Sequence, residues 1–113
     1  MSDGAALWRA IKESMRNCSA AIETVPQTGR EKAELESAYR QALAQRELEL
    51  RASGKYPLGM IRDLARGSKT VSDAYVAWQS QEALFTATLE QINYTKRETD
   101  TLREQMAREW GRQ

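Results

Sequence analysis

The chain has 113 residues, of which 41% are apolar and 29% charged, and its 17 basic and 16 acidic side chains leave a formal net charge of +1. This length suits one domain, and the composition is too apolar for a disordered chain. The near-neutral charge excludes a global electrostatic attraction to nucleic acid or to an anionic membrane. No apolar run could span a bilayer, and the amino-terminal residues lack a signal core. We therefore expect a cytoplasmic protein that makes no membrane contact.

The residue types on which many enzymes depend are scarce. The chain has no histidine, and Cys18 is its only cysteine, which excludes histidine-based triads, the usual zinc sites and an intrachain disulfide. Asp100 and Glu104 lie four residues apart, but Arg108 follows Glu104 at the same spacing, so surface ion pairs account for these carboxylates. We predict that the protein is not an enzyme, has no catalytic, cofactor-binding or metal-binding residues, and needs no cofactor.

Helix-forming residues dominate the whole chain, and no alternating run of β-branched or aromatic residues predicts a strand. The fold class that we predict is all-α, an elongated helical hairpin or bundle that forms a single domain over residues 1–113. Its helices are expected at about 4–24, 30–52, 57–66 and 68–110.

The first predicted helix carries apolar residues at alternating spacings of three and four, the pattern of a coiled-coil seam. This seam consists of Trp8, Ile11, Met15, Cys18, Ile22 and Val25. Pro26 should end the helix, because the residue before a proline is pushed out of the helical region. Gly29 then falls in a predicted loop.

The last predicted helix repeats an apolar residue every seven positions from Val71 through Trp78, Phe85 and Ile92 to Met106. At 1.5 Å per residue this helix would be roughly 65 Å long, whereas a compact domain of this size is about 35 Å across. Either the first helix or a second copy of the chain must cover the distal residues. We favour a second copy, so the prediction is a homodimer, with antiparallel helices.

The connector before the last helix is basic. It contains Lys55, Arg62, Arg66 and Lys69, with Tyr56 among them. These side chains could contact phosphates and stack a base, or bind a protein, but no phosphate-binding loop motif is present. The alternative is a solvated turn with cations near helix ends.

Three tryptophans are unusual in so short a chain. Trp8 and Trp78 fit predicted seams, which indicates core positions. Trp110 lies near the carboxyl terminus beside Arg108, where packing partners run out, so it is either a binding anchor or part of a dimer interface.

The second half of the chain resembles a family of small uncharacterised helical phage and prophage proteins. The resemblance depends on an "ARG" turn at residues 65–67 and an "REW" ending at residues 108–110, and it covers roughly Leu35 to Gly111. The family carries no activity that could be transferred. The resemblance implies a phage or prophage origin and action in the cytoplasm of a bacterial host cell.

These observations favour a non-catalytic phage or prophage accessory protein that acts by stoichiometric binding of a bacterial or phage protein. Such a protein could inhibit a host defence system, for example a CRISPR nuclease complex. The alternative is a nucleic-acid-binding accessory factor in phage recombination or replication. The partner-binding candidates are Lys55, Tyr56, Arg62, Arg66, Lys69, Arg108 and Trp110.

Overall fold

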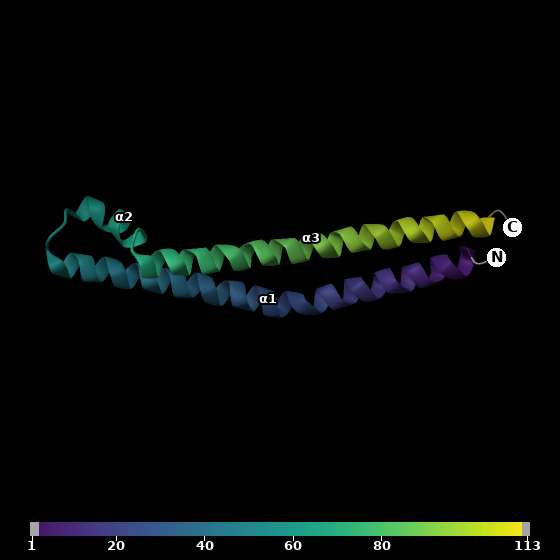
Figure 1. Ribbon diagram of the computed structural model, residues 1–113, viewed down its shortest axis with the longest axis horizontal. Coiled ribbons are helices and arrows are strands. Elements are labelled where there is room, and N and C mark those ends of the chain that lie inside the picture. Colours follow the sequence, from purple (N-terminus) through teal and green to yellow (C-terminus); the bar gives the residue numbers. More distant parts are fainter. Residues whose placement is uncertain (1–2, 112–113) are drawn as a thin grey trace. The chain divides into compact units, whose positions relative to one another are not determined.

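The computed structural model describes residues 3–111. Its elements in chain order are α1 (Asp3–Ser53), the 3-10 helix η1 (Leu58–Met60), α2 (Ile61–Arg66) and α3 (Lys69–Gly111) (Figure 1). No strand occurs in this range, so the all-α prediction and the long C-terminal helix are confirmed. None of the helices in this range is long and apolar enough to cross a bilayer.

The chain divides into two compact units, which are described separately. Unit 1 combines the chain up to Pro26 with the chain from Thr86 onward, and unit 2 comprises Gln27–Phe85. The start of α1 and the end of α3 belong to unit 1. The end of α1, the connector with η1 and α2, and the start of α3 belong to unit 2.

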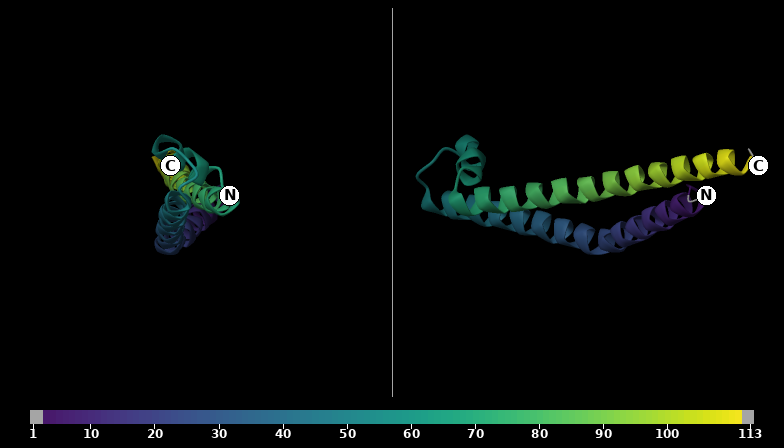
Figure 2. Two further views of the ribbon diagram at one scale, coloured as in Figure 1. Left: turned by 90° about the vertical axis from the view of Figure 1, so that its left-hand side faces the viewer. Right: turned by 45° about the vertical axis from the view of Figure 1, so that its right-hand side comes forward.

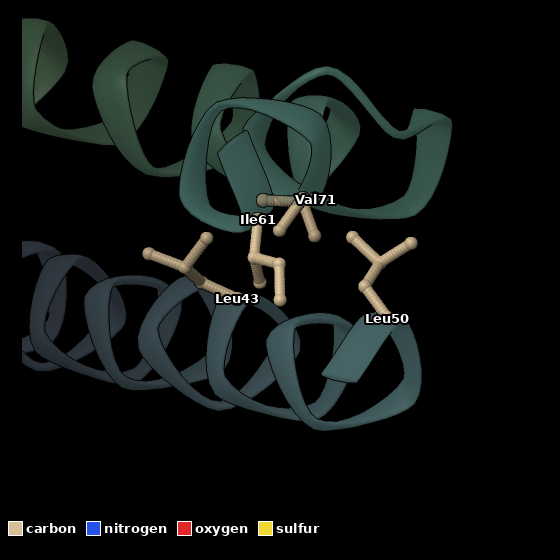
Figure 3. Packing of buried hydrophobic residues seen from close by; sticks show 5 residues of the cluster. Leu43, Leu50, Ile61 and Val71 are labelled. Atoms are coloured by element: carbon tan, nitrogen blue, oxygen red, sulfur yellow. The ribbon is translucent and has the colours of Figure 1, made fainter. Parts of the chain in front are cut away.

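Unit 2 holds the larger apolar core. Its buried cluster takes residues from three helices, namely Leu43, Leu50, Ile61, Ala65 and Val71. Figure 3 shows the leucines of α1 pointing toward the side chains of α2 and α3. The two views in Figure 2 place α2 beside the end of α1 and the start of α3. This packing fixes the connector on the helix pair and leaves the polar side chains of α2 at the surface.

An aromatic cluster lies next to this core. The rings of Tyr39 and Trp78 are stacked at a centroid distance of 5.4 Å, and Tyr75 meets Trp78 edge-on at 6.0 Å. The prediction that Trp78 is a packing residue agrees with this arrangement, because the three rings shield one another from solvent.

The predicted break at Pro26 is wrong. One helix of 51 residues, α1, runs through the proline, so the separate helices at 4–24 and 30–52 and the loop between them do not form. Proline removes one backbone hydrogen bond and crowds the preceding turn, at a cost of about 3 kcal/mol. The inward-facing residues on both sides of the proline keep the three-and-four spacing of one continuous helix, and their packing offsets this cost. These residues are Ala21, Val25, Thr28, Lys32 and Leu35.

Gly29 owes its place to packing and not to a turn. A Cβ atom on Gly29 would lie 3.2 Å from Cε2 of Phe85, inside ordinary van der Waals contact. Glycine therefore lets α1 approach the Phe85 ring of α3 closely, and the chain remains helical on both sides of it.

The predicted seam of the first helix is wrong at every second position. In unit 1, α1 turns inward Leu7, Ile11, Ser14, Cys18, Ala21 and Val25, whereas Trp8, Met15 and Ile22 are exposed. Both possible seams share Ile11, Cys18 and Val25, so the apolar pattern alone does not decide between them. The observed seam places a serine and an alanine between the helices. Trp8, at 51% exposure, is therefore not a core residue.

The inward-facing residues at the far end of α3 are covered within the chain, whereas Trp110 there is 69% exposed. Ile92 is buried, and Leu102 and Met106 are half-buried, in the unit that α3 forms with the start of α1. The expectation that these residues need a second copy is therefore corrected: the first helix covers them. The homodimer remains a prediction that this packing neither requires nor tests.

Candidate functional site

The interior of unit 1 is polar for a helix pair. Its buried apolar side chains, in the described part, are Ile11 and Ile92, and beside them three hydroxyl residues are buried. Thr99 Oγ1 donates to the Thr95 carbonyl at 3.0 Å. The Ser14 Oγ lies 2.6 Å from Thr99 Oγ1, which accepts its hydrogen, and 3.3 Å from the Thr95 carbonyl oxygen. These bonds satisfy the hydroxyls but add little apolar burial, so the pair is held together weakly by its own core.

The large apolar side chains of unit 1 gather on one flank of this interior. In the heptad register, the inward d residues of unit 1 are Leu7, Ser14 and Ala21 on α1 and Thr88, Thr95, Leu102 and Glu109 on α3. The position after each d residue forms the surface that we term the tryptophan face. It consists of Trp8, Met15 and Ile22 on α1 and Leu89, Lys96, Arg103 and Trp110 on α3. Its five apolar members are all exposed, and Trp110 most of all, at 69%.

Two adjoining grooves run along this face. The first is lined by Trp8, Ile11, Met15, Arg103, Met106, Ala107 and Trp110. The second is lined by Met15, Cys18, Ser19, Lys96, Thr99, Asp100 and Arg103. Met15 and Arg103 belong to both grooves, and Arg103 Nη2 donates to the Met15 sulfur at 3.6 Å. The two grooves therefore adjoin at Met15 and Arg103, between α1 and α3.

The opposite flank of unit 1 has a different character. The positions before each inward a residue are Ala10, Asn17 and Thr24 on α1 and Gln91, Glu98 and Gln105 on α3. These six positions themselves carry no large apolar side chain, while Tyr94 and Leu102 line a separate hollow beside Glu98. Solvation alone would not sort large apolar residues to one side, and a contiguous exposed apolar patch usually marks an interaction surface.

The tryptophan face is positively charged at its edges. Lys96 and Arg103 belong to it, and Lys12 Nζ lies 5.8 Å from the centre of the Trp8 ring. None of these three cations forms an ion pair within residues 3–111. Asp100 is the one carboxylate among the residues that line the two grooves.

The predicted candidates at the distal end are placed differently. Trp110 lies on the tryptophan face and lines its groove. Arg108 is exposed but lines neither groove. Trp110 thus has the setting expected of an anchor, whereas the structure gives Arg108 no partner surface.

The predicted candidates in the connector lie in unit 2 and are partly engaged. Arg62 Nε lies 3.4 Å from Oε1 of Glu47, and Lys69 Nζ lies 3.1 Å from Oδ2 of Asp73. Local carboxylates therefore offset two of the four predicted cations, which weakens the connector as a phosphate-binding surface.

The remaining connector candidates are exposed. Lys55 and Tyr56 lie in the segment between α1 and η1, and Leu58 and Met60 of η1 itself are also exposed. Arg66 lines a separate hollow with Tyr39, Ser72 and Tyr75. The connector is thus a mixed basic and apolar surface.

Sequence reasoning missed Trp8, Met15, Lys96 and Arg103. The sequence of α1 allows two seams of equal spacing. Whichever series faces inward, the residues that belong only to the other series form a stripe on the flank of the helix. Considering both seams would have placed Trp8, Met15 and Ile22 on one surface of α1.

No group of three or more cysteine or acidic side chains in the described residues is placed to hold a metal ion. No protein-family model matches the chain, and neither the search of curated proteins nor that of solved structures gave a match.

Proposed function

We propose that this protein is a non-catalytic binding protein that acts by stoichiometric association with another protein through the tryptophan face. The observation that carries the proposal is the one-sided distribution of large apolar residues in unit 1, with two exposed tryptophans, Trp8 and Trp110, along one groove. Tryptophan is among the residue types that contribute most to binding when a partner covers them.

A protein partner is favoured over nucleic acid by the charge distribution. The chain as a whole carries a net charge of +1, and Arg62 and Lys69 in the connector are paired with carboxylates. A connector that binds nucleic acid would need several unpaired cations aligned along a backbone, because such binding depends on phosphate neutralisation.

The resemblance to small phage and prophage proteins supports a biological setting for this proposal. In that setting the protein acts in the cytoplasm of a bacterial host, on a host or phage protein. Inhibition of a host defence system, such as a CRISPR nuclease complex, suits a small protein that covers a partner surface and performs no chemistry. The partner itself is to be identified by affinity capture from host lysate.

The proposal is tested by affinity capture of the full chain in bacterial host lysate, with the wild type and two variants side by side. Replacing Trp8 and Trp110 together by alanine should abolish capture of the partner, because both side chains are exposed and their loss leaves the interior of unit 1 intact. The matched control is Tyr94→Ala, which removes an exposed aromatic residue of α3 that lines neither groove.

Two results would overturn the proposal. One is a partner captured equally by the wild type and by the double tryptophan variant, which would place binding elsewhere. The other is tight binding of labelled single- or double-stranded DNA at physiological salt that Lys55→Glu and Arg66→Glu abolish. That result would favour the nucleic-acid alternative, because it would show that the connector binds phosphates.

A further inference from the structure

The shape and charge of the tryptophan face identify the kind of partner segment that it fits. We infer that its occupant is an amphipathic α-helix with acidic residues beside its apolar stripe, which docks as a third helix on unit 1. This inference rests on the proposed function and names the chemistry of the partner at that surface.

The shape of the surface suits a helix. The two grooves join end to end between antiparallel helices and are lined from both sides, by Trp8 and Met15 of α1 and by Arg103 and Trp110 of α3. A helix lays an apolar stripe into such a hollow, with side chains every three or four residues meeting the groove. An extended strand would leave its backbone groups unpaired there, because α1 and α3 offer no free backbone edge.

The interior of unit 1 supports the same conclusion. Ser14, Thr95 and Thr99 occupy positions that apolar residues fill in a self-sufficient helix pair. The apolar residues that would compensate lie on the tryptophan face. A third helix would bury them and complete a three-helix core, as helix bundles do with their inward stripes.

The charges select the chemistry of the helix edges. Lys96 and Arg103 line the grooves and Lys12 lies beside the Trp8 ring, all three without an ion pair in the described residues, and Asp100 is the one acid that lines the grooves. Glutamate or aspartate beside the apolar stripe of the partner would meet these cations. Complementary edge charges of this kind direct the choice and orientation of helices in bundles.

The same charges argue against a second copy of this chain as the occupant. Two tryptophan faces brought together would place four groove-lining cations, Lys96 and Arg103 of each copy, against two Asp100 carboxylates. Like charges at close range suppress association. The homodimer expected from the sequence therefore needs another surface or does not form.

The test uses two synthetic peptides of about 21 residues, enough to span the groove region. Both carry leucine at the inward heptad positions, and one carries glutamate and the other lysine at the flanking positions. Binding of each fluorescein-labelled peptide to the full chain is followed by anisotropy. We expect the glutamate peptide to bind at least about tenfold more tightly than the lysine peptide, because several cations contribute at once.

The variants locate this binding. Replacing Lys96 and Arg103 by glutamate should reverse the preference between the peptides. Trp110→Ala should weaken the glutamate peptide by at least about tenfold, whereas Tyr94→Ala should leave its affinity unchanged. Circular dichroism of each variant at the same concentration controls for helix content.

Three outcomes would overturn the inference. Equal affinity for the two peptides would show that charge does not select the occupant. Failure of both peptides to bind would show that the face does not accept a helix. A dimer in sedimentation that Trp110→Ala dissociates would show that a second copy covers the face. In each case, the proposed function would still hold if a protein other than this chain were captured from lysate and its capture required Trp8 and Trp110.

Discussion

The buried hydroxyl layer of unit 1 allows a quantitative test of how its helices are held together. Ser14 is 1% exposed, and its hydroxyl lies 2.6 Å from that of Thr99. A hydrogen bond between neutral buried groups contributes about 1 kcal/mol net, and an unsatisfied partner costs about 1–3 kcal/mol. Ser14→Ala leaves Thr99 bonded to the Thr95 carbonyl, so this variant should lose about 1 kcal/mol.

The double-mutant cycle then isolates the pair. Thr99→Val keeps the side-chain shape and should also cost about 1 kcal/mol. The double variant should be more stable than the sum of the single losses predicts, by about 1 kcal/mol, because the bond between the two hydroxyls is lost in each single variant but only once in the double variant. The reason for a small coupling is that Ser14 also reaches the Thr95 carbonyl at 3.3 Å.

Hydrogen exchange is the suitable assay, because it reports each unit separately. Protection of amides near Ile11 and Ile92 should fall in the single variants, while amides near Val71 in unit 2 serve as the internal control. Strictly additive losses would refute the hydrogen-bonded layer. Equal loss of protection around Val71 would refute the treatment of the layer as a local feature of unit 1.

Three further predictions concern local geometry. Gly29→Leu should destabilise the protein by about 1–3 kcal/mol, because its side chain would collide with the Phe85 ring; an unchanged thermal melting temperature would contradict this. Gly54 has φ of 67°, so Gly54→Ala should cost about 1 kcal/mol in urea unfolding, and a neutral result would count against the left-handed end of α1. The hydrogen bond from Arg46 holds the pKa of Glu49 below its ordinary value. The stabilisation is therefore present above the unfolded-state pKa and is lost as the pH falls through the lower folded-state pKa. Arg46→Gln should raise the midpoint of Glu49 in a carbon-13 NMR titration, and an unmoved midpoint would exclude the bond as the cause.

The helical elements could be predicted where the apolar repeat is unambiguous. The helix expected at 68–110 is observed as Lys69–Gly111, because a seven-residue repeat without glycine or proline before its end has one helical interpretation. The connector helix was likewise expected near its observed place, although η1 takes its first turn.

The course of α1 could not be predicted from local rules. Pro26 disfavours a helix locally, and the rule that a helix ends before a proline is reliable in isolation. In this chain the inward pattern continues past the proline in the same phase, from Val25 to Thr28. The packing of the inward-facing residues before and after Pro26 therefore outweighs the local cost of the proline. The proline is easier to recognise in the sequence than this packing is.

The candidate site was only partly predictable for a related reason. Trp110 was identified from its position near the chain end, whereas Trp8 was assigned to the core because its seam is as regular as the observed one. The ion pair between Arg62 and Glu47 joins residues 15 positions apart across two helices, which no helical spacing rule predicts. The wrong assignment of Trp8 and the unexpected ion pair of Arg62 both concern contacts between helices. Such contacts depend on how the helices pack against each other.

Site-specific photo-cross-linking in host cells shows whether another protein covers the tryptophan face. A photoreactive phenylalanine analogue at position 15, which lines both grooves, is compared with the same analogue at position 94. We expect one dominant cross-linked protein from position 15 and none from position 94. No cross-link from position 15, or the same product from both positions, would contradict it.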